Sequence, residues 1–135
     1  MQSDEMMKEI LETTETIASV GLSGNEEKVS RWVAVYLQSA GFRVIPVNPT
    51  ADKILGEKSY PDLESIPEKI DVVQLFRPSK AVLPFVESAI KIGAKVVWMQ
   101  EGIVNEVAAQ RAREAGLQVV MDACMRATHQ RLCLS

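Results

Sequence analysis

Short apolar runs alternate with helix-like stripes along this chain, and the alternation limits the fold more than any other feature. The runs 71–76 (DVVQLF) and 94–99 (AKVVWM) are almost continuously apolar. Such runs are typical of strands in a sheet that is covered on both faces. Shorter runs that stop at turn-forming residues predict further strands over 16–20, 42–47 and 117–121.

Helices are predicted between these strands, from apolar residues spaced three and four apart. The stripes cover 29–40, 82–90 and 108–115, a short helix is predicted at 6–11, and the stretch after 121 reads as a polar tail. Strands alternating with helices imply parallel strands joined by right-handed crossovers. The prediction is therefore an α/β fold with a Rossmann-like, three-layer, doubly wound parallel sheet of about five strands in the order 3-2-1-4-5.

Size and composition predict one domain over residues 1–135. A chain of 135 residues buries about two thirds of its unfolded surface, which is enough for a single core. The net charge of −3 argues against a broad nucleic-acid or membrane surface. No apolar run approaches the roughly 18 residues that span a bilayer, and the acidic amino terminus does not resemble a signal peptide. A cytoplasmic location is expected.

Residues that would carry catalysis or bind a metal are scarce. Cys124 and Cys133 are too few for a disulfide scaffold and lack zinc-site spacing, so we expect no metal. His129 is the only histidine, and it is expected on the surface of the tail. No Ser-His-Asp, Cys-His or paired-carboxylate set stands out, so no catalytic residue is assigned. Trp32 and Trp98 are expected in the core.

The loop that leaves the first predicted strand is the strongest candidate for a ligand site, because doubly wound sheets bind ligands beyond the carboxyl ends of their strands. Gly21, Ser23 and Ser30 offer bare amides and hydroxyls before a helix amino end, which favours phosphate. Lys28 and Arg31 add positive charge. The alternative is a plain strand-to-helix turn with solvated polar residues.

Two acidic residues in the same loop bear on this alternative. Glu26 and Glu27 would occupy the positive end of the helix if the helix began before them. If the helix instead begins near Val29, they lie out in the loop and Ser30 stays available.

The ends of the later strands provide further candidates, each with two readings. Val47-Asn48-Pro49 stands where an NAD-binding unit would carry an acid, so it forms either an uncharged wall for adenine or ribose or a proline-defined turn. Arg77 either pairs with a phosphate, or with a carboxylate such as Glu101, or enters the next helix in solvent. Gln100-Glu101-Gly102 either lines the site or forms an ordinary turn.

The chain resembles the small stand-alone CoA-binding proteins, which are similar to the CoA-binding domain of the succinyl-CoA synthetase alpha subunit. The resemblance covers about residues 16–122. It rests on the following segments in this order: IASVGLS (17–23), Ser30, VIPVNP (44–49), ILGEKSYPDLESIPEKIDVV (54–73), FRPS (76–79), GAKVVWMQEGIVNEVAAQRAREAGLQVVMD (93–122) and Cys124.

The resemblance implies a Rossmann-like fold that holds CoA or an acyl-CoA. Carried onto this chain, the loop from Gly21 and Leu22 to Ser30 would take the phosphates, and Val47, Asn48 and Pro49 would border the adenosine. Phe76, Arg77 and Pro78, with Gln100, Glu101 and Gly102, would line the path of the pantetheine arm.

The sequence departs from this family in three places. Asn25-Glu26-Glu27-Lys28-Val29 stands where relatives often carry proline. Relatives often place Lys or Gly at position 50, where this chain has threonine and where Lys53 is the nearest lysine. Asp122-Ala123-Cys124 replaces a frequent Asp-Arg-Cys.

The leading interpretation is a CoA-binding module without catalytic activity that contacts neither nucleic acid nor membrane. One alternative is a Rossmann-type enzyme, either NAD-dependent or acyl-CoA-processing. Another is an interaction subunit of a larger complex. The exposed faces of the edge strands leave a homodimer open.

Overall fold

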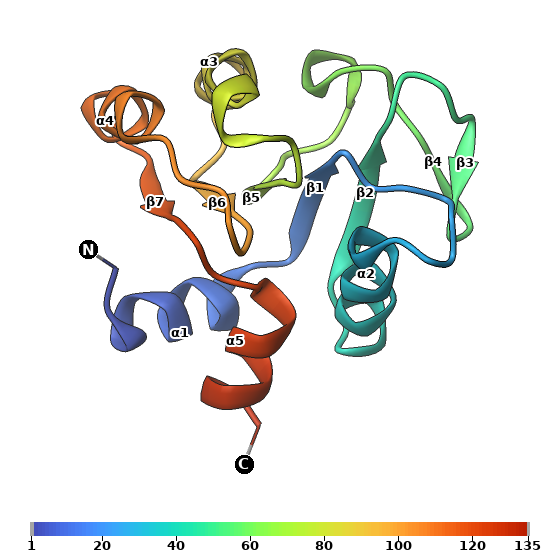
Figure 1. Cartoon of the computed structure of the whole chain (residues 1–135), viewed down its shortest axis with the longest axis horizontal. Coiled ribbons are helices and arrows are strands. Elements are labelled where there is room, and N and C mark those ends of the chain that lie inside the picture. Colours follow the sequence, from blue (N-terminus) through green and yellow to red (C-terminus); the bar gives the residue numbers. More distant parts are fainter. Residues whose placement is uncertain (1, 135) are drawn as a thin grey trace.

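A parallel β-sheet with helices on both faces forms the protein (Figure 1). The computed structural model describes residues 2–134. Its elements are α1 (Asp4–Thr13), β1 (Thr16–Val20), α2 (Val29–Ser39), β2 (Arg43–Val47), β3 (Lys53–Ile54), β4 (Glu57–Lys58), the 3₁₀ turn η1 (Leu63–Ser65), β5 (Val72–Leu75), the 3₁₀ turn η2 (Ser79–Ala81), α3 (Leu83–Lys91), β6 (Val96–Met99), α4 (Glu106–Glu114), β7 (Gln118–Val120) and α5 (Met125–Leu132). The predicted α/β class and the five main strands are confirmed.

The predicted strand order is wrong. The five parallel strands lie in the order β2-β1-β5-β6-β7, which is 2-1-3-4-5 when these five alone are numbered. Two features explain the difference. Residues Val72–Leu75 are buried along the whole of β5, as expected of an inner strand. Pro46 has no amide to donate to a neighbouring strand, so β2 is best placed at the edge of the sheet.

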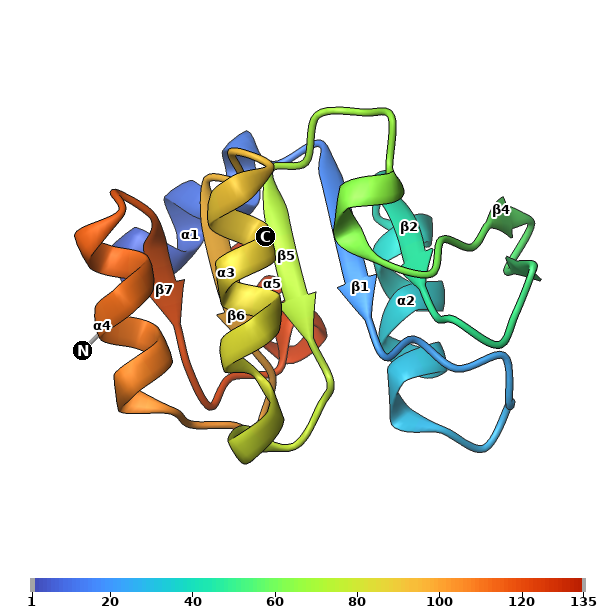
Figure 2. The ribbon, with the colours of Figure 1, turned by 90° about the horizontal axis from the view of Figure 1, so that it is seen from above.

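The two faces of the sheet carry different helices (Figures 1 and 2). Helices α1, α2 and α5 cover one face, where Leu11, Leu37 and Met125 pack with Ile17 and Trp98. Helices α3 and α4 cover the other face with small side chains. Their buried residues there are Val86, Ala89, Ala108, Ala109 and Ala112. Because side chains alternate along a strand, each inner strand supplies both cores.

The carboxyl-terminal segment is not a polar tail. Residues Met125–Leu132 form α5, which packs against the sheet. Half-buried His129 accepts or donates a hydrogen bond through Nδ1 to the Tyr36 hydroxyl at 2.7 Å, and its ring contacts Phe42 edge-on. The expectation of a surface histidine is therefore wrong, because the ring has become part of the contact between α5 and α2.

The two tryptophans differ from each other. Trp98 is fully buried, as predicted, whereas Trp32 is 62% exposed. The Trp32 indole nitrogen donates to the main-chain oxygen of Glu26 at 2.6 Å, so the ring lies over the preceding loop. The buried stripe of α2 consists instead of Val33, Ala34 and Leu37.

Candidate functional site

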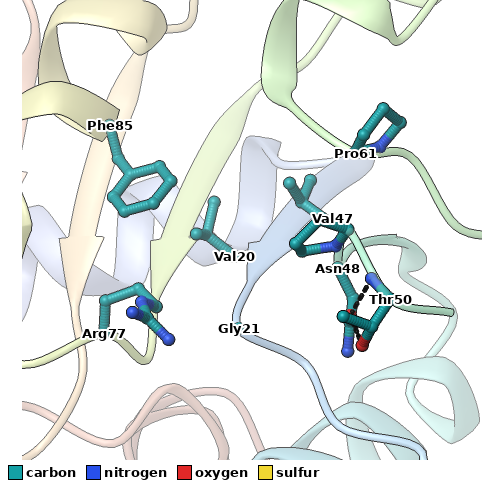
Figure 3. Close-up of a pocket in the computed structure, with 9 residues that line it drawn as sticks. Val20, Gly21, Val47, Asn48, Thr50, Pro61, Arg77 and Phe85 are labelled. Carbon is teal, nitrogen blue, oxygen red and sulfur yellow. Dashed lines mark hydrogen bonds between the residues drawn. The ribbon is translucent and has the colours of Figure 1, made fainter.

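A cavity of about 390 Å³ opens at the carboxyl ends of β1 and β2 (Figure 3). Strand order reverses beside it, because the chain leaves β1 toward β2 on one side and later continues from β5 toward β6 on the other. This is the position at which doubly wound sheets bind ligands. The lining residues are Val20, Gly21, Val47, Asn48, Pro49, Thr50, Pro61, Arg77 and Phe85.

Gly21 lets the end of β1 pass close to the segment that follows β5. It has a φ of +89°, which side chains disfavour, and a Cβ there would lie 3.3 Å from Cβ of Phe76 and 3.4 Å from Cδ of Arg77. Its amide donates to the main-chain oxygen of Val47 at 3.1 Å. The glycine thus joins three strand ends around one cavity.

The loop after β1 uses several of its donors within the protein. The Ser23 amide donates to the Ser30 hydroxyl oxygen at 3.1 Å, and the Asn25 amide donates to the Ser23 hydroxyl oxygen at 3.0 Å. Between residues 2 and 134, the amides of Leu22 and Gly24 have no protein acceptor. The loop therefore has fewer free amides than the sequence predicted, because the Ser23 amide already donates to Ser30.

Helix α2 begins at Val29, so Glu26 and Glu27 lie in the loop. Both are exposed to solvent, away from the first turn of the helix. The amides of Val29 and Ser30 belong to that first turn, where no intrahelical partner exists. The loop therefore keeps an amino end that can face an anion.

Asn48 fixes the corner after β2. Its side-chain amide donates to the main-chain oxygen of Leu22 at 3.1 Å. Its Oδ1 accepts from the amide and the hydroxyl of Thr50, at 2.9 and 2.8 Å. Pro61 adds an apolar wall beside Val47, opposite Phe85 and Arg77 (Figure 3). The corner is rigid and uncharged.

A second cavity of about 390 Å³ adjoins the first, because Arg77 lines both. It is lined by Val29, Phe76, Arg77, Pro78, Gln100, Glu101, Ile103 and Cys124. Arg77 is exposed, and among the described residues neither it nor Glu101 forms an ion pair. The pairing of Arg77 with Glu101 considered from the sequence is therefore not formed, and the guanidinium is available to a ligand.

Gln100 lies at the inner wall of the second cavity and is only 3% exposed. Its Oε1 accepts from Nε2 of Gln74 at 3.1 Å and from the amide of Met125 at 3.0 Å. These bonds hold the oxygen toward the protein interior. The segment also forms the ordinary turn considered from the sequence, because the Ile103 amide donates to the main-chain oxygen of Gln100 at 2.9 Å. Gln100 and Glu101 therefore belong to a turn and also line the second cavity.

Some predicted residues do not line either cavity. Leu22 is buried and offers only its main chain. The Gly102 amide donates to Oδ1 of Asp122 at 2.7 Å. Arg31 on α2 and Lys53 on β3 line neither cavity, and Ser23 and Ser30 bond to each other.

Other lining residues were not predicted. Phe85 belongs to a predicted helix stripe, and Pro61 belongs to an irregular segment without periodicity. Thr50 directly follows the predicted corner Val47-Asn48-Pro49. Threonine is common in turns, so its place beside the corner could have been predicted. Cys124 is a part of the family resemblance that carries no predicted role in the site, because its place at the cavity depends on how α5 packs.

The chemistry of the two cavities suits binding of a polar ligand with an anionic part. No group of three His, Cys, Asp or Glu residues that could hold a metal occurs within residues 2–134. The groups with displaced pKa values lie elsewhere. Cys133, for example, has its pKa raised by burial and secondly by the charge of Glu12. Over the same described range, no helix is long and apolar enough to cross a membrane.

The fold places a cavity at the topological switch point of an α/β domain. A family model described as "CoA binding domain" matches residues 15–130, and the chain belongs to this family. The chain is 42% identical over 123 residues to the uncharacterized protein YneT of Bacillus subtilis, which covers 91% of both chains.

Two other comparisons extend this result. A solved structure of a hypothetical protein from Pyrococcus horikoshii has a TM-score of 0.94 and 45% identity, and the match covers 97% of this chain and 92% of that one. Acetate–CoA ligase [ADP-forming] II of Archaeoglobus fulgidus is 33% identical over 82 residues, which is 59% of this chain. That match spans only 12% of the ligase. The chain is thus homologous to the CoA-binding domain of such ligases and corresponds to a small part of their length.

Proposed function

We propose that this protein binds coenzyme A or an acyl-CoA as a single domain without catalytic activity. The observation that carries the proposal is the pair of adjoining cavities that meet at Arg77. Each has a volume within the range of small-molecule sites, about 300–1,000 Å³. Because Arg77 lines both, a long, jointed ligand that passes Arg77 could occupy the two cavities along the carboxyl ends of β1, β5 and β6. Membership of the CoA-binding family supports the same ligand.

Each part of the ligand has a matching surface. The uncharged wall of Val47, Pro49 and Pro61, facing Phe85, suits a flat adenine ring. The Arg77 guanidinium, which lines both cavities, suits phosphate oxygens. The amides of Leu22 and Gly24 line neither cavity, but they have no acceptor between residues 2 and 134 and lie in the loop that leaves the first cavity at Gly21. The largely apolar second cavity suits the pantetheine arm.

The residues argue for binding and against turnover. Glu101 is the acid in the second cavity, and the sole histidine is engaged with Tyr36 on α5. General acid–base catalysis needs a donor and an acceptor placed at the reacting group. We therefore propose a binding module and not an acyl-CoA-processing or NAD-dependent enzyme.

A thermal melting series tests the ligand assignment. The purified chain is heated alone and with equal excess of CoA, dephospho-CoA, NAD or AMP. Because a ligand that binds only the folded state stabilises it, CoA is expected to raise the melting temperature the most. Stabilisation by NAD without stabilisation by CoA would contradict the assignment.

A further inference from the structure

Cys124 brings a thiol to the wall of the second cavity. It is half-buried and precedes α5, and its side chain makes no capping hydrogen bond. Its main-chain oxygen accepts from the amide and the hydroxyl of Thr128, at 2.9 and 2.8 Å. The backbone at Cys124 is thus fixed while the sulfur stays unbonded. Among the described residues, Cys124 is the sole cysteine that lines either of the two cavities.

Gln100 adds a hydrogen-bond donor to the wall of the same cavity. The side chain is 97% buried, since 3% of its surface is exposed. Its oxygen is held inward by Gln74 and Met125, so its amide nitrogen is turned away from them. That nitrogen has no acceptor within residues 2–134. The nitrogen is not one of the fully buried polar atoms without a partner, which among the described residues are Ser19 Oγ, Gln74 Oε1 and Arg126 Nε. It therefore keeps some exposure at the cavity wall and can donate to an acceptor that enters the cavity.

The pantetheine arm of CoA provides both matching groups. It carries amide carbonyl oxygens, which accept hydrogen bonds, and it ends in a thiol. With the nucleotide end beside Gly21 and Asn48, the arm passes Arg77 and enters the cavity that holds Gln100 and Cys124. This placement rests on the proposed function.

We infer that Cys124 captures CoA covalently, as a mixed disulfide formed by exchange with CoA disulfide. The Cys124 thiolate attacks one sulfur of the CoA disulfide, and a bond forms between Sγ and that sulfur. The sulfur–sulfur bond of the CoA disulfide breaks, and the second CoA leaves as a thiolate that takes up a proton. No further oxidant is needed, because the CoA disulfide already carries the oxidised bond.

Cys133 provides a matched comparison within the same chain. It is also a free, half-buried cysteine, but it lies at the other end of α5, about 13 Å further along the helix axis. It packs against the core that contains Leu11 and Leu37, and burial raises its pKa. A raised pKa leaves a smaller fraction of Cys133 as the reactive thiolate, and Cys133 lines neither of the two cavities. Cys133 is therefore expected to react slowly.

Intact-mass measurement after incubation with CoA disulfide tests the inference. The reduced full chain is expected to gain the mass of one CoA less two hydrogens, and dithiothreitol should remove the adduct. Cys124→Ser should abolish the adduct, and Cys133→Ser should retain it. Reaction with CoA disulfide should be at least about tenfold faster than with glutathione disulfide, because binding holds the reacting sulfurs together.

The binding of reduced CoA to the wild type, measured by calorimetry, separates this inference from the proposed function. Binding together with an adduct on Cys124 supports both proposals. Binding without an adduct, an adduct on Cys133, or equal rates with glutathione disulfide overturns the covalent capture and leaves the binding function standing. Absence of CoA binding to the wild type overturns both.

Discussion

The side-chain amide of Asn48 donates to the main-chain oxygen of Leu22 at 3.1 Å, and this bond joins the end of β2 to the loop that leaves β1. The same side chain holds Thr50 through its oxygen. One residue therefore sets the spacing between the proposed adenine wall and the proposed phosphate loop. That spacing has to be fixed before ligand arrives if the site is preorganised.

Replacing Asn48 with aspartate is expected to lower the free energy of unfolding by about 1–2 kcal/mol. Asn48→Asp keeps the acceptor for Thr50, but it loses the donor and places negative charge against the Leu22 oxygen. Urea unfolding provides the measurement. Asn25→Asp is the control, because it adds the same charge while the oxygen that accepts from the Glu27 amide is kept. Equal losses in the free energy of unfolding for the two substitutions would show that the Asn48–Leu22 hydrogen bond does not contribute to stability.

Gly21→Ala is expected to destabilise the fold by about 1–3 kcal/mol, because it combines a positive φ with a crowded Cβ. Phe76 and Arg77 would have to move. Gly56→Ala has a similar φ of +79° with nothing within 4 Å, and so measures the backbone strain alone. Gly24→Ala has neither problem, since its nearest contact is 4.0 Å away. Thermal melting should rank the losses as Gly21, then Gly56, then Gly24, and any other order contradicts the crowding.

Arg77→Ala is expected to weaken CoA binding by about 2 kcal/mol, roughly 30-fold, and to reduce the salt dependence of binding. Stability should stay unchanged, because the side chain is exposed and forms no ion pair among residues 2–134. Arg111→Ala is the control, since Arg111 on α4 pairs with Glu87 on α3 and lines neither cavity. Calorimetry at two salt concentrations gives both quantities. If Arg77→Ala binds CoA as tightly as the wild type, the proposal that Arg77 contacts the ligand is contradicted.

Asp71 makes folding stability depend on pH at the amino end of the sheet. Burial alone raises its pKa, but the amides of Thr16 and Glu15, both at 3.0 Å, and the Lys95 ammonium outweigh burial and lower the pKa below its ordinary value. A carboxylate with a lowered folded pKa stabilises the protein above the unfolded value of about 4, and the stabilisation is lost as pH falls through the folded pKa.

Asp71→Asn is therefore expected to cost about 2 kcal/mol at neutral pH, with a cost that shrinks in acid. Urea unfolding at a series of pH values measures it. Asp4→Asn is the control, because Asp4 pairs with Arg131 on the surface and such pairs contribute little. A cost for Asp71→Asn that does not vary between neutral and acidic pH would contradict the assignment of the charge.

The sequence predicted the strands and most helices because their periodicity is local. It did not predict α5, in which only Met125 and Thr128 are buried and no repeating stripe exists. The strand order depends on long-range pairing, although Pro46 in β2 carried a signal for an edge strand. Gly21, Asn48, Arg77 and Gln100 could be predicted for the site since they follow strand ends. Phe85, Pro61 and Cys124 come from a helix body and irregular segments, whose placement follows from tertiary packing.

Amide NMR of the isotope-labelled chain titrated with CoA tests the central claim most directly. The account predicts that the shifted resonances cluster at the carboxyl ends of β1, β2, β5 and β6, including Gly21, Leu22, Asn48, Arg77 and Gln100. A cavity of about 520 Å³ beside β7, lined by Gln2, Arg113 and Met121 among others, provides an internal comparison. Shifts confined to that cavity, or no shifts at a large excess of CoA, would contradict the proposed site.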